Sequence, residues 1–286
     1  MMINLQDIRY VRLGTPDVAA ASRYATNVLG LQEATREGAA VYFRSDRRDL
    51  TLVYFAGDAR DHTVGFEVGS AAALHAAAAE IEAQRLPVRR GTRDESELRR
   101  CADFIHFRDP SGNGIDLIVG AGDARDAHMP AREAGITGFS HIGLRTTDAA
   151  RDEAFWTRVC NARVSDRIGA APLLRIDRVH HKIALFPSTR AGVQHINHQV
   201  AGIDDLMRSY YFLRERGVRI VFGPGRHPTS SAIFLYFEGP DGMVYEYSTG
   251  VRAITDEANH EPRQFPFESG SFCMWGSRPD IAEFRS

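Results

Sequence analysis

The feature that most constrains this chain of 286 residues is that one pattern of segments occurs in it twice. Residues 8–17 align with residues 139–148, and each segment is a strand-like run ending in an aspartate that can cap a following helix. Residues 104–117 align with residues 234–247, and each contains a Pro-x-Gly turn between two apolar stretches. The sequence therefore predicts a fold built from two copies of one unit.

Helical patterns recur at matching places in the two copies. Four helices are expected, at residues 18–29, 71–84, 149–160 and 203–217. Each copy then contains a strand–helix–three-strand module twice, and a curved mixed sheet is the natural way to bury such modules against each other. The predicted fold class is α+β, with two tandem domains, each of paired βαβββ modules forming a curved, partly open, barrel-like sheet.

Composition shifts divide the chain into a first domain at 1–120, a linker at 121–136, a second domain at 137–250 and a tail at 251–286. The linker is polar, contains Pro130 and has no sustained apolar face. The tail is apolar, and we expect it to cover an active site or an interface rather than lie free in solvent. The aromatic residues that favour this expectation are Phe265, Phe267, Phe272 and Trp275.

Bulk properties exclude several kinds of partner. The chain is 43% hydrophobic and 25% charged, which is typical of a globular protein, and its net charge of -2 favours neither nucleic acid nor a membrane surface. No apolar stretch is long enough to span a bilayer, and the N-terminus has no secretory-signal pattern. Three widely spaced cysteines indicate reduced thiols, so a cytoplasmic protein is predicted.

Three polar side chains interrupt apolar, strand-like segments of the second copy: His141, His195 and Glu246. A single histidine in such a strand is more often a hydrogen-bonded structural residue than a ligand. A buried carboxylate, however, is costly unless a cation or a donor meets it. Two imidazoles and one carboxylate form the facial set that holds non-haem Fe(II) with open positions, so the three together favour a metal site.

The first copy serves as an internal control for this set. At the aligned positions it has Tyr10 for His141, His62 or Thr63 near His195, Asp116 for Glu246, and His106 for Tyr236. A complete ligand set thus occurs only once in a fold built twice. We therefore expect a first domain without a complete metal site and a second domain that carries the chemistry.

These residues resemble the type I extradiol, catechol-cleaving dioxygenases of the vicinal oxygen chelate superfamily, such as catechol 2,3-dioxygenase and 2,3-dihydroxybiphenyl 1,2-dioxygenase. The family pattern is a histidine, a spacer, an apolar-Tyr pair, a Pro-x-Gly turn and a ligand glutamate. Here it is formed by His227, Leu235-Tyr236, Pro240-Asp241-Gly242 and Glu246. Gly239 departs from the family, which usually has a polar residue or alanine there. The resemblance extends over about residues 5 to 280 of the chain.

The resemblance implies a role for each site residue. His141, His195 and Glu246 would be the metal ligands, with His198 as the competitor for the second position. His181 would be the acid–base group, with His180 as the alternative, because alternation along a strand lets only one of two neighbours point into a pocket. His227 and Tyr236 would donate hydrogen bonds to the substrate.

The implied activity is that of an Fe(II)-dependent dioxygenase, with Mn(II) as the alternative metal. It would insert both atoms of O2 into a small catechol-type diol during aromatic degradation. Biphenyl-type, monocyclic and carboxylated diols all remain open, and Arg175, Arg178 and Arg226 are candidates for binding a carboxylate. The resemblance also implies a homo-oligomer. The alternatives are a glyoxalase-like isomerase or thiol transferase on the same fold, and a binding protein without catalysis.

Overall fold

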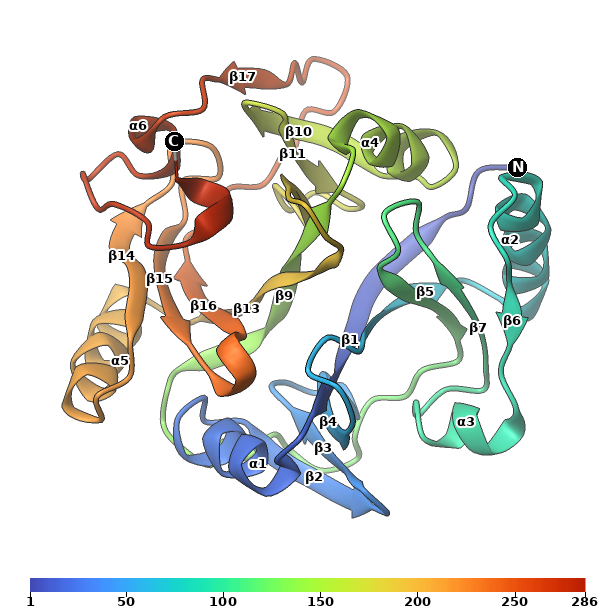
Figure 1. Ribbon diagram of the computed structural model, residues 1–286, viewed down its shortest axis with the longest axis horizontal. Coiled ribbons are helices and arrows are strands. Elements are labelled where there is room, and N and C mark those ends of the chain that lie inside the picture. Colours follow the sequence, from blue (N-terminus) through green and yellow to red (C-terminus); the bar gives the residue numbers. More distant parts are fainter. Residues whose placement is uncertain (286) are drawn as a thin grey trace.

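The computed structural model describes residues 1–285 and contains two mixed sheets with helices around their periphery (Figure 1). The first sheet has eight strands in the order β2-β3-β4-β1-β5-β8-β7-β6. The second has nine strands in the order β14-β15-β16-β13-β9-β12-β11-β10-β17. Apart from the added β17, each strand of the second sheet has a counterpart in the first, so the predicted α+β class and the duplication are confirmed.

The elements follow one another in the same sequence in both copies. The first copy comprises β1 (Leu5–Thr15), α1 (Val18–Asn27), β2 (Gln32–Glu37), β3 (Ala40–Arg44), β4 (Leu52–Ala56), β5 (His62–Val68), α2 (Ala71–Ala83), β6 (Arg89–Arg90), α3 (Arg93–Glu97), β7 (Asp103–Arg108) and β8 (Gly114–Val119). The second comprises β9 (Ile136–Thr146), α4 (Ala149–Arg158), β10 (Arg163–Ile168), β11 (Ala171–Arg175), β12 (Ile183–Pro187), β13 (Gly192–Val200), α5 (Ile203–Glu215), β14 (Ile220–Arg226), β15 (Ile233–Glu238), η1 (Pro240–Gly242) and β16 (Val244–Thr249). The tail adds β17 (Arg263–Phe265), α6 (Ser269–Phe272) and η2 (Ala282–Phe284).

The predicted aspartate caps begin the equivalent helices α1 and α4. The carboxylate of Asp17 accepts a hydrogen bond from the backbone N–H of Ala20 at 2.8 Å, and that of Asp148 accepts one from Arg151 at 3.0 Å. A carboxylate at this position satisfies a backbone donor that has no partner within the helix. The four longest helices all begin at the predicted residues and end one or two residues earlier than predicted.

One apolar core joins the two copies. Trp156 of α4 is fully buried and packs against Phe66 of β5, with ring centroids 5.5 Å apart. Tyr54 of β4 and Tyr245 of β16 join the copies through their hydroxyl groups, which hydrogen-bond to each other. The two sheets are thus packed together, and the shared core holds the strands of the second sheet in place. No helix within residues 1–285 is long and apolar enough to cross a membrane.

Candidate metal centre

His141, His195 and Glu246 converge from three neighbouring strands, β9, β13 and β16. Asn197 of β13 lies opposite His141 in the antiparallel pairing with β9 and opposite Glu246 in the parallel pairing with β16. The three ligand atoms all lie within 4.8 Å of one another. Oε2 of Glu246 is 3.0 Å from Nε2 of His141 and 3.5 Å from Nε2 of His195.

The triad is buried, and its carboxylate lies between two imidazole rings. His141 is 5% exposed, and His195 and Glu246 are each 1% exposed. Burial alone would raise the pKa of Glu246, but the adjacent His141 holds that pKa well below its usual value. Burial lowers the pKa of His195 to about 3, so this ring stays neutral. Among the described residues, Oε2 of Glu246 meets no hydrogen-bond donor, as expected of an atom that binds a metal ion.

Gln194 selects which nitrogen of His195 faces the triad. The side-chain oxygen of Gln194 is hydrogen-bonded to Nδ1 of His195, and because an amide oxygen only accepts, Nδ1 carries the proton. Nε2 then carries no proton and can bind a metal; in this structure it lies 3.1 Å from Nε2 of His141. Gly143 leaves room for this arrangement, since a Cβ at that position would lie 2.7 Å from Cε1 of His195 and 2.8 Å from Oε1 of Gln194. The donor set therefore fits a divalent cation such as Fe(II).

A pocket opens beside the triad and is mostly apolar. Its lining consists of Ile168, Leu173, His181, Ala184, Phe186, His195, His227, Thr229, Ser230, Tyr236, Phe272 and Phe284. Two of the aromatic residues, Phe272 and Phe284, come from the tail, and their rings stack with centroids 5.0 Å apart. Of these two, only Phe272 is predicted from the sequence. The other tail residues predicted to cover a site, Phe265, Phe267 and Trp275, do not line the pocket, and Phe267 and Trp275 are 41% and 51% exposed.

His180 and His181 are both buried, and strand alternation does not apply to them. They precede β12 instead of lying within it, so they do not point to opposite faces of a strand. His181 lines the pocket, and its ring centroid is 4.2 Å from that of His141. His180 instead donates a hydrogen bond from Nε2 to the carboxylate of Asp166 at 2.8 Å. The sequence offered no signal for Asp166, which lies 14 residues earlier on β10.

His227 and Tyr236 are hydrogen-bonded to each other at the edge of the triad. His227 donates from Nδ1 to the carbonyl of Phe272 at 2.7 Å, and its Nε2 lies 3.2 Å from the hydroxyl of Tyr236. Burial raises the pKa of Tyr236 well above its usual value, so the hydroxyl keeps its proton and can donate a hydrogen bond. Nε2 of His227 is 3.7 Å from Oε1 of Glu246. The side chains of His227, Tyr236 and Glu246 therefore lie close together at one end of the triad.

His198, the alternative second ligand, lies away from the triad. It is fully buried, and its ring packs near Phe139 with centroids 6.1 Å apart. The pairing of β13 with β9 is irregular between Asn197 and His198. Neither ring nitrogen of His198 has a hydrogen-bond partner among the described residues.

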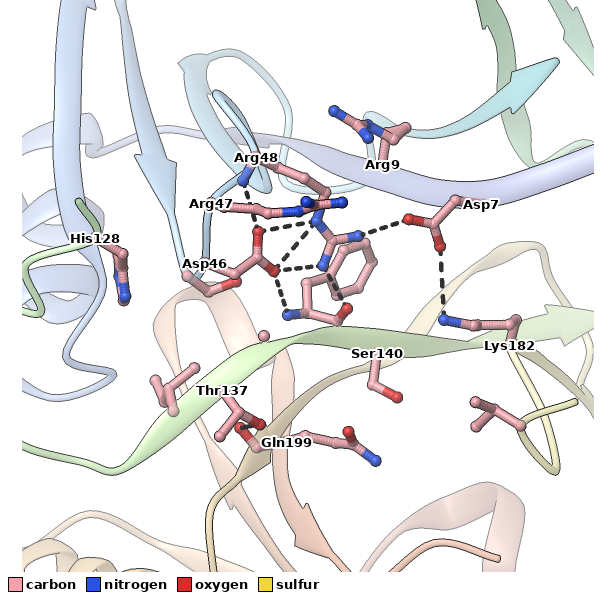
Figure 2. Close-up of a pocket in the computed structure, with 15 residues that line it drawn as sticks. Asp7, Arg9, Asp46, Arg47, Arg48, His128, Thr137, Ser140, Lys182 and Gln199 are labelled. Carbon is pink, nitrogen blue, oxygen red and sulfur yellow. Dashed lines mark hydrogen bonds and ion pairs between the residues drawn. The ribbon is translucent and has the colours of Figure 1, made fainter. Parts of the chain in front are cut away.

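A larger cleft of about 540 Å³ lies between the two sheets, where Ser140 and Lys182, the neighbours of His141 and His181, contribute to its lining. Figure 2 shows Asp46 paired with Arg48, and Asp7 between Arg48 and Lys182. Arg48 pairs with Asp46 and also donates to the backbone carbonyl of Phe139 at 2.6 Å. Lys182 lies 3.5 Å from Asp7. Ion pairs and hydrogen bonds across the cleft thus link the two copies. Among the described residues, none that line it belong to a group that could hold a metal ion.

Comparisons with known proteins agree with this architecture. The profile described as "Glyoxalase/Bleomycin resistance protein/Dioxygenase superfamily" matches residues 7–117 and 138–247. The iron-dependent extradiol dioxygenase of Rhodococcus jostii (strain RHA1) is 26% identical over 296 residues, covering 96% of this chain and 97% of the relative. The 3-methylcatechol 2,3-dioxygenase of Pseudomonas putida is 27% identical and covers 88% of this chain and 92% of the relative.

Solved structures share the whole fold. The crystal structure of a halotolerant catechol dioxygenase matches with a TM-score of 0.87 at 24% identity, covering 99% of this chain and 97% of the other. That of a Mn(II)-bound glyoxalase from Novosphingobium aromaticivorans also gives 0.87, at 22% identity and with coverage of 99% and 94%. The fold and the site together define a protein of paired βαβββ modules with a buried set of side chains that could hold a metal ion. The chain belongs to the Glyoxalase/Bleomycin resistance protein/Dioxygenase superfamily.

Proposed function

We propose that this protein is an extradiol dioxygenase, which opens the ring of a catechol-type diol beside the hydroxyl pair and places both atoms of O2 in the product. The observation that carries the proposal is the His141–His195–Glu246 set of converging acceptors next to an apolar pocket. Relatives named as dioxygenases of 3-methylcatechol and of biphenyl-2,3-diol support it. The second domain (137–250) is assigned the chemistry, and the first (1–120) acts as scaffold.

His141, His195 and Glu246 are the proposed ligands of Fe(II), with Mn(II) as the alternative metal. Two neutral imidazoles and one carboxylate leave coordination positions open, and the ion balances the charge of Glu246. When bound, the metal supplies a Lewis-acid position for the oxygens of the diol and a redox centre for reaction with O2. The name of the Rhodococcus relative favours iron.

Two further side chains act on the substrate directly in this proposal, and a third positions one of them. His181 takes a proton from a substrate hydroxyl and returns one later, since its ring lines the pocket beside His141. The Tyr236 hydroxyl keeps its proton and donates a hydrogen bond to a substrate oxygen that gains negative charge. Before substrate binds, that hydroxyl donates to Nε2 of His227, whose ring is fixed by the bond from Nδ1 to the Phe272 carbonyl, and it turns to the substrate oxygen when the diol enters.

The pocket lining favours a diol with an uncharged, apolar substituent. None of the side chains that line the pocket is an arginine, a lysine or a carboxylate. Arg175, one candidate for binding a carboxylate, is itself buried and pairs with Glu257 while donating to the carbonyl of Val164 at 2.7 Å. A carboxylated catechol would therefore enter without a partner for its charge, which is costly. Alkyl- or aryl-substituted catechols are the proposed substrates.

The test is oxygen consumption by protein loaded with Fe(II) without air and then given O2 and a 3-substituted catechol. We expect O2 uptake and a yellow ring-cleavage product from 3-methylcatechol or 2,3-dihydroxybiphenyl, and much slower uptake with 3,4-dihydroxyphenylacetate. In a parallel assay, the hemithioacetal of methylglyoxal and glutathione tests the glyoxalase-like alternative. Isomerisation of that compound without O2 uptake on any catechol would replace the dioxygenase assignment.

We also propose that the protein is a cytoplasmic homo-oligomer. The cysteines support the location, since all three are free thiols, two of them buried. The oligomeric state rests on the family resemblance alone. Light scattering of the purified protein measures it directly, and a mass near 31.8 kDa would contradict an oligomer.

A further inference from the structure

A buried chain of hydrogen bonds leads from His181 in the pocket to the tail. Nδ1 of His181 lies 3.0 Å from Nδ1 of His180, and Nε2 of His180 lies 2.8 Å from the carboxylate of Asp166. His181 is 7% exposed, while His180 and Asp166 are completely buried. Asp166 and His180 have no role in the function proposed above, since neither is a metal ligand or contacts the substrate.

Two guanidinium groups balance the charge at the far end of this chain. Arg252 donates to Asp166 at 2.9 Å, and Arg263 of β17 donates at 2.7 Å and again through its backbone N–H at 2.9 Å. Burial alone would raise the pKa of Asp166, but its bonds to His180 and Arg263 hold the pKa well below the usual value. Asp166 is thus ionised, and two arginines already balance its charge without a contribution from His180.

The direction of each hydrogen bond follows from what each group can donate. An ionised carboxylate only accepts, so Nε2 of His180 carries a proton. Burial lowers the pKa of His180, and a neutral imidazole has only one N–H, so its Nδ1 must accept. The donor in the remaining bond is then Nδ1 of His181. That leaves Nε2 of a neutral His181 without a proton.

We propose that Asp166 and His180 are positioning residues that fix the His181 ring in its Nδ1–H tautomer, so that Nε2 is available as the base for the substrate hydroxyl. The catalytic part of this inference rests on the function proposed above. The tautomer itself does not, because it follows from the two bonds and the burial of the three side chains. In the Ser-His-Asp enzymes a buried carboxylate orients a catalytic histidine in the same way.

Asp166 also anchors the tail, and the experiment has to separate the two roles. Arg263 pairs with Asp166 where β17 lies beside β10, and the same tail carries Phe272 and Phe284 over the pocket. A change at Asp166 would therefore disturb both His181 and the pocket. A change at His180 removes the link to His181 and leaves the bonds of Asp166 to Arg252 and Arg263 in place.

The kinetic test compares His180→Leu with His180→Asn in the Fe(II)-loaded protein. Leucine cannot accept from His181, whereas the asparagine oxygen can take the place of Nδ1 and restore that bond. We expect kcat of the leucine variant to fall about 10- to 100-fold, by analogy with the loss seen when the hydrogen-bond partner of a metal-ligating histidine is removed. KM for 3-methylcatechol and metal content should stay within about twofold, and asparagine should recover most of kcat.

Arg263→Gln is the control for the tail. It loosens β17 but retains His180 and Asp166, so it should raise KM more than it lowers kcat. An unchanged kcat in His180→Leu, or equal loss in the leucine and asparagine variants, would overturn the positioning role.

A second readout needs no turnover. Nitrogen-15 NMR of ring-labelled histidines in the Zn(II)-loaded protein reports which nitrogen of each ring carries the proton, and His181→Asn identifies the His181 signal. We expect the Nδ1–H form in the wild type and in His180→Asn, and a mixture of tautomers in His180→Leu. An Nε2–H form in the wild type would refute the inference. Absence of O2 uptake by the wild type would instead refute the proposed function and leave this measurement valid.

Discussion

The two copies treat an equivalent carboxylate in opposite ways. Asp116 in the first copy and Glu246 in the second occupy matching places on β8 and β16, and each is almost completely buried. Asp116 accepts from the Tyr10 hydroxyl at 2.8 Å, Arg99 at 2.7 Å and His106 at 2.8 Å. Oε2 of Glu246 has no donor within residues 1–285. The first copy thus neutralises its carboxylate with its own guanidinium, and the second leaves it for an ion.

The strand pairing also shows which residues of the first copy correspond to the site residues of the second. Thr63 pairs with Arg12 as His195 pairs with Gly143, so Thr63, not His62, is the counterpart of His195. Gly65 lies opposite Tyr10, whose ring occupies the space that a Cβ at position 65 would fill. The first copy also has the short helix α3 just before Arg99, where the second copy has no helix. The fold therefore positions a central carboxylate, and the neighbours determine what it binds.

The largest expected effect separates the true second ligand from its competitor. His195→Ala removes one of three ligand atoms, so Fe(II) should be lost completely during desalting, whereas the matched variant His198→Ala should retain it. Metal analysis of the two proteins after gel filtration measures the difference. Iron retained by His195→Ala and lost by His198→Ala would reverse the assignment of the second ligand.

The next prediction compares the two carboxylates through stability. Asp116→Asn leaves the buried Arg99 without its counter-charge and should destabilise the protein by about 3–5 kcal/mol. Glu246→Gln in the metal-free protein removes a carboxylate that has no cation, and should cost far less or even stabilise it. Urea unfolding of both variants, prepared with chelator, gives the two free energies. A larger loss in Glu246→Gln than in Asp116→Asn would show that the protein itself satisfies Glu246.

The sequence predicted the features that are local along the chain. The repeat is visible because each copy has the same strand ends, aspartate caps and Pro-x-Gly turns, and His141, His195 and Glu246 each interrupt a short apolar segment. Strand alternation does not apply to His180 and His181, because both residues precede β12, and of the two only His181 lines the pocket.

Contacts between distant residues were beyond sequence reasoning. Asp166 meets Arg263, 97 residues later, and His227 meets the backbone carbonyl of Phe272, 45 residues later. Nothing in the local pattern around these residues marks them as partners, since only the packed tail brings them together. Gln194 was missed for a different reason: a polar residue beside a ligand is ordinary, and its role depends on the space left by Gly143 across the strand pair.

Gln194 offers a finer test. Its hydrogen bond keeps the proton of His195 on Nδ1, so that Nε2 of this ring can act as a metal ligand. Gln194→Leu removes the group that holds the proton on Nδ1, and metal affinity should fall about 10- to 100-fold. Gln194→Glu, which retains an acceptor at the same place, should bind the metal nearly as well as the wild type. Competition with a chelator of known affinity measures both variants. Equal weakening by leucine and glutamate would assign Gln194 to packing alone.

The smallest expected effect concerns the tail, which contributes Phe272 and Phe284 to the lining of the pocket. Phe284→Ala removes an aromatic wall of the pocket, so KM for 3-methylcatechol should rise about two- to fivefold, equivalent to ~0.5–1 kcal/mol of lost apolar contact. Metal content should be unchanged, because Phe284 is not one of the three residues of the triad. The matched control is Trp275→Ala, since that ring is 51% exposed and does not line the pocket. Equal changes in KM for the two variants would mean that the tail affects substrate binding only through general loosening, and that Phe284 forms no part of the binding surface.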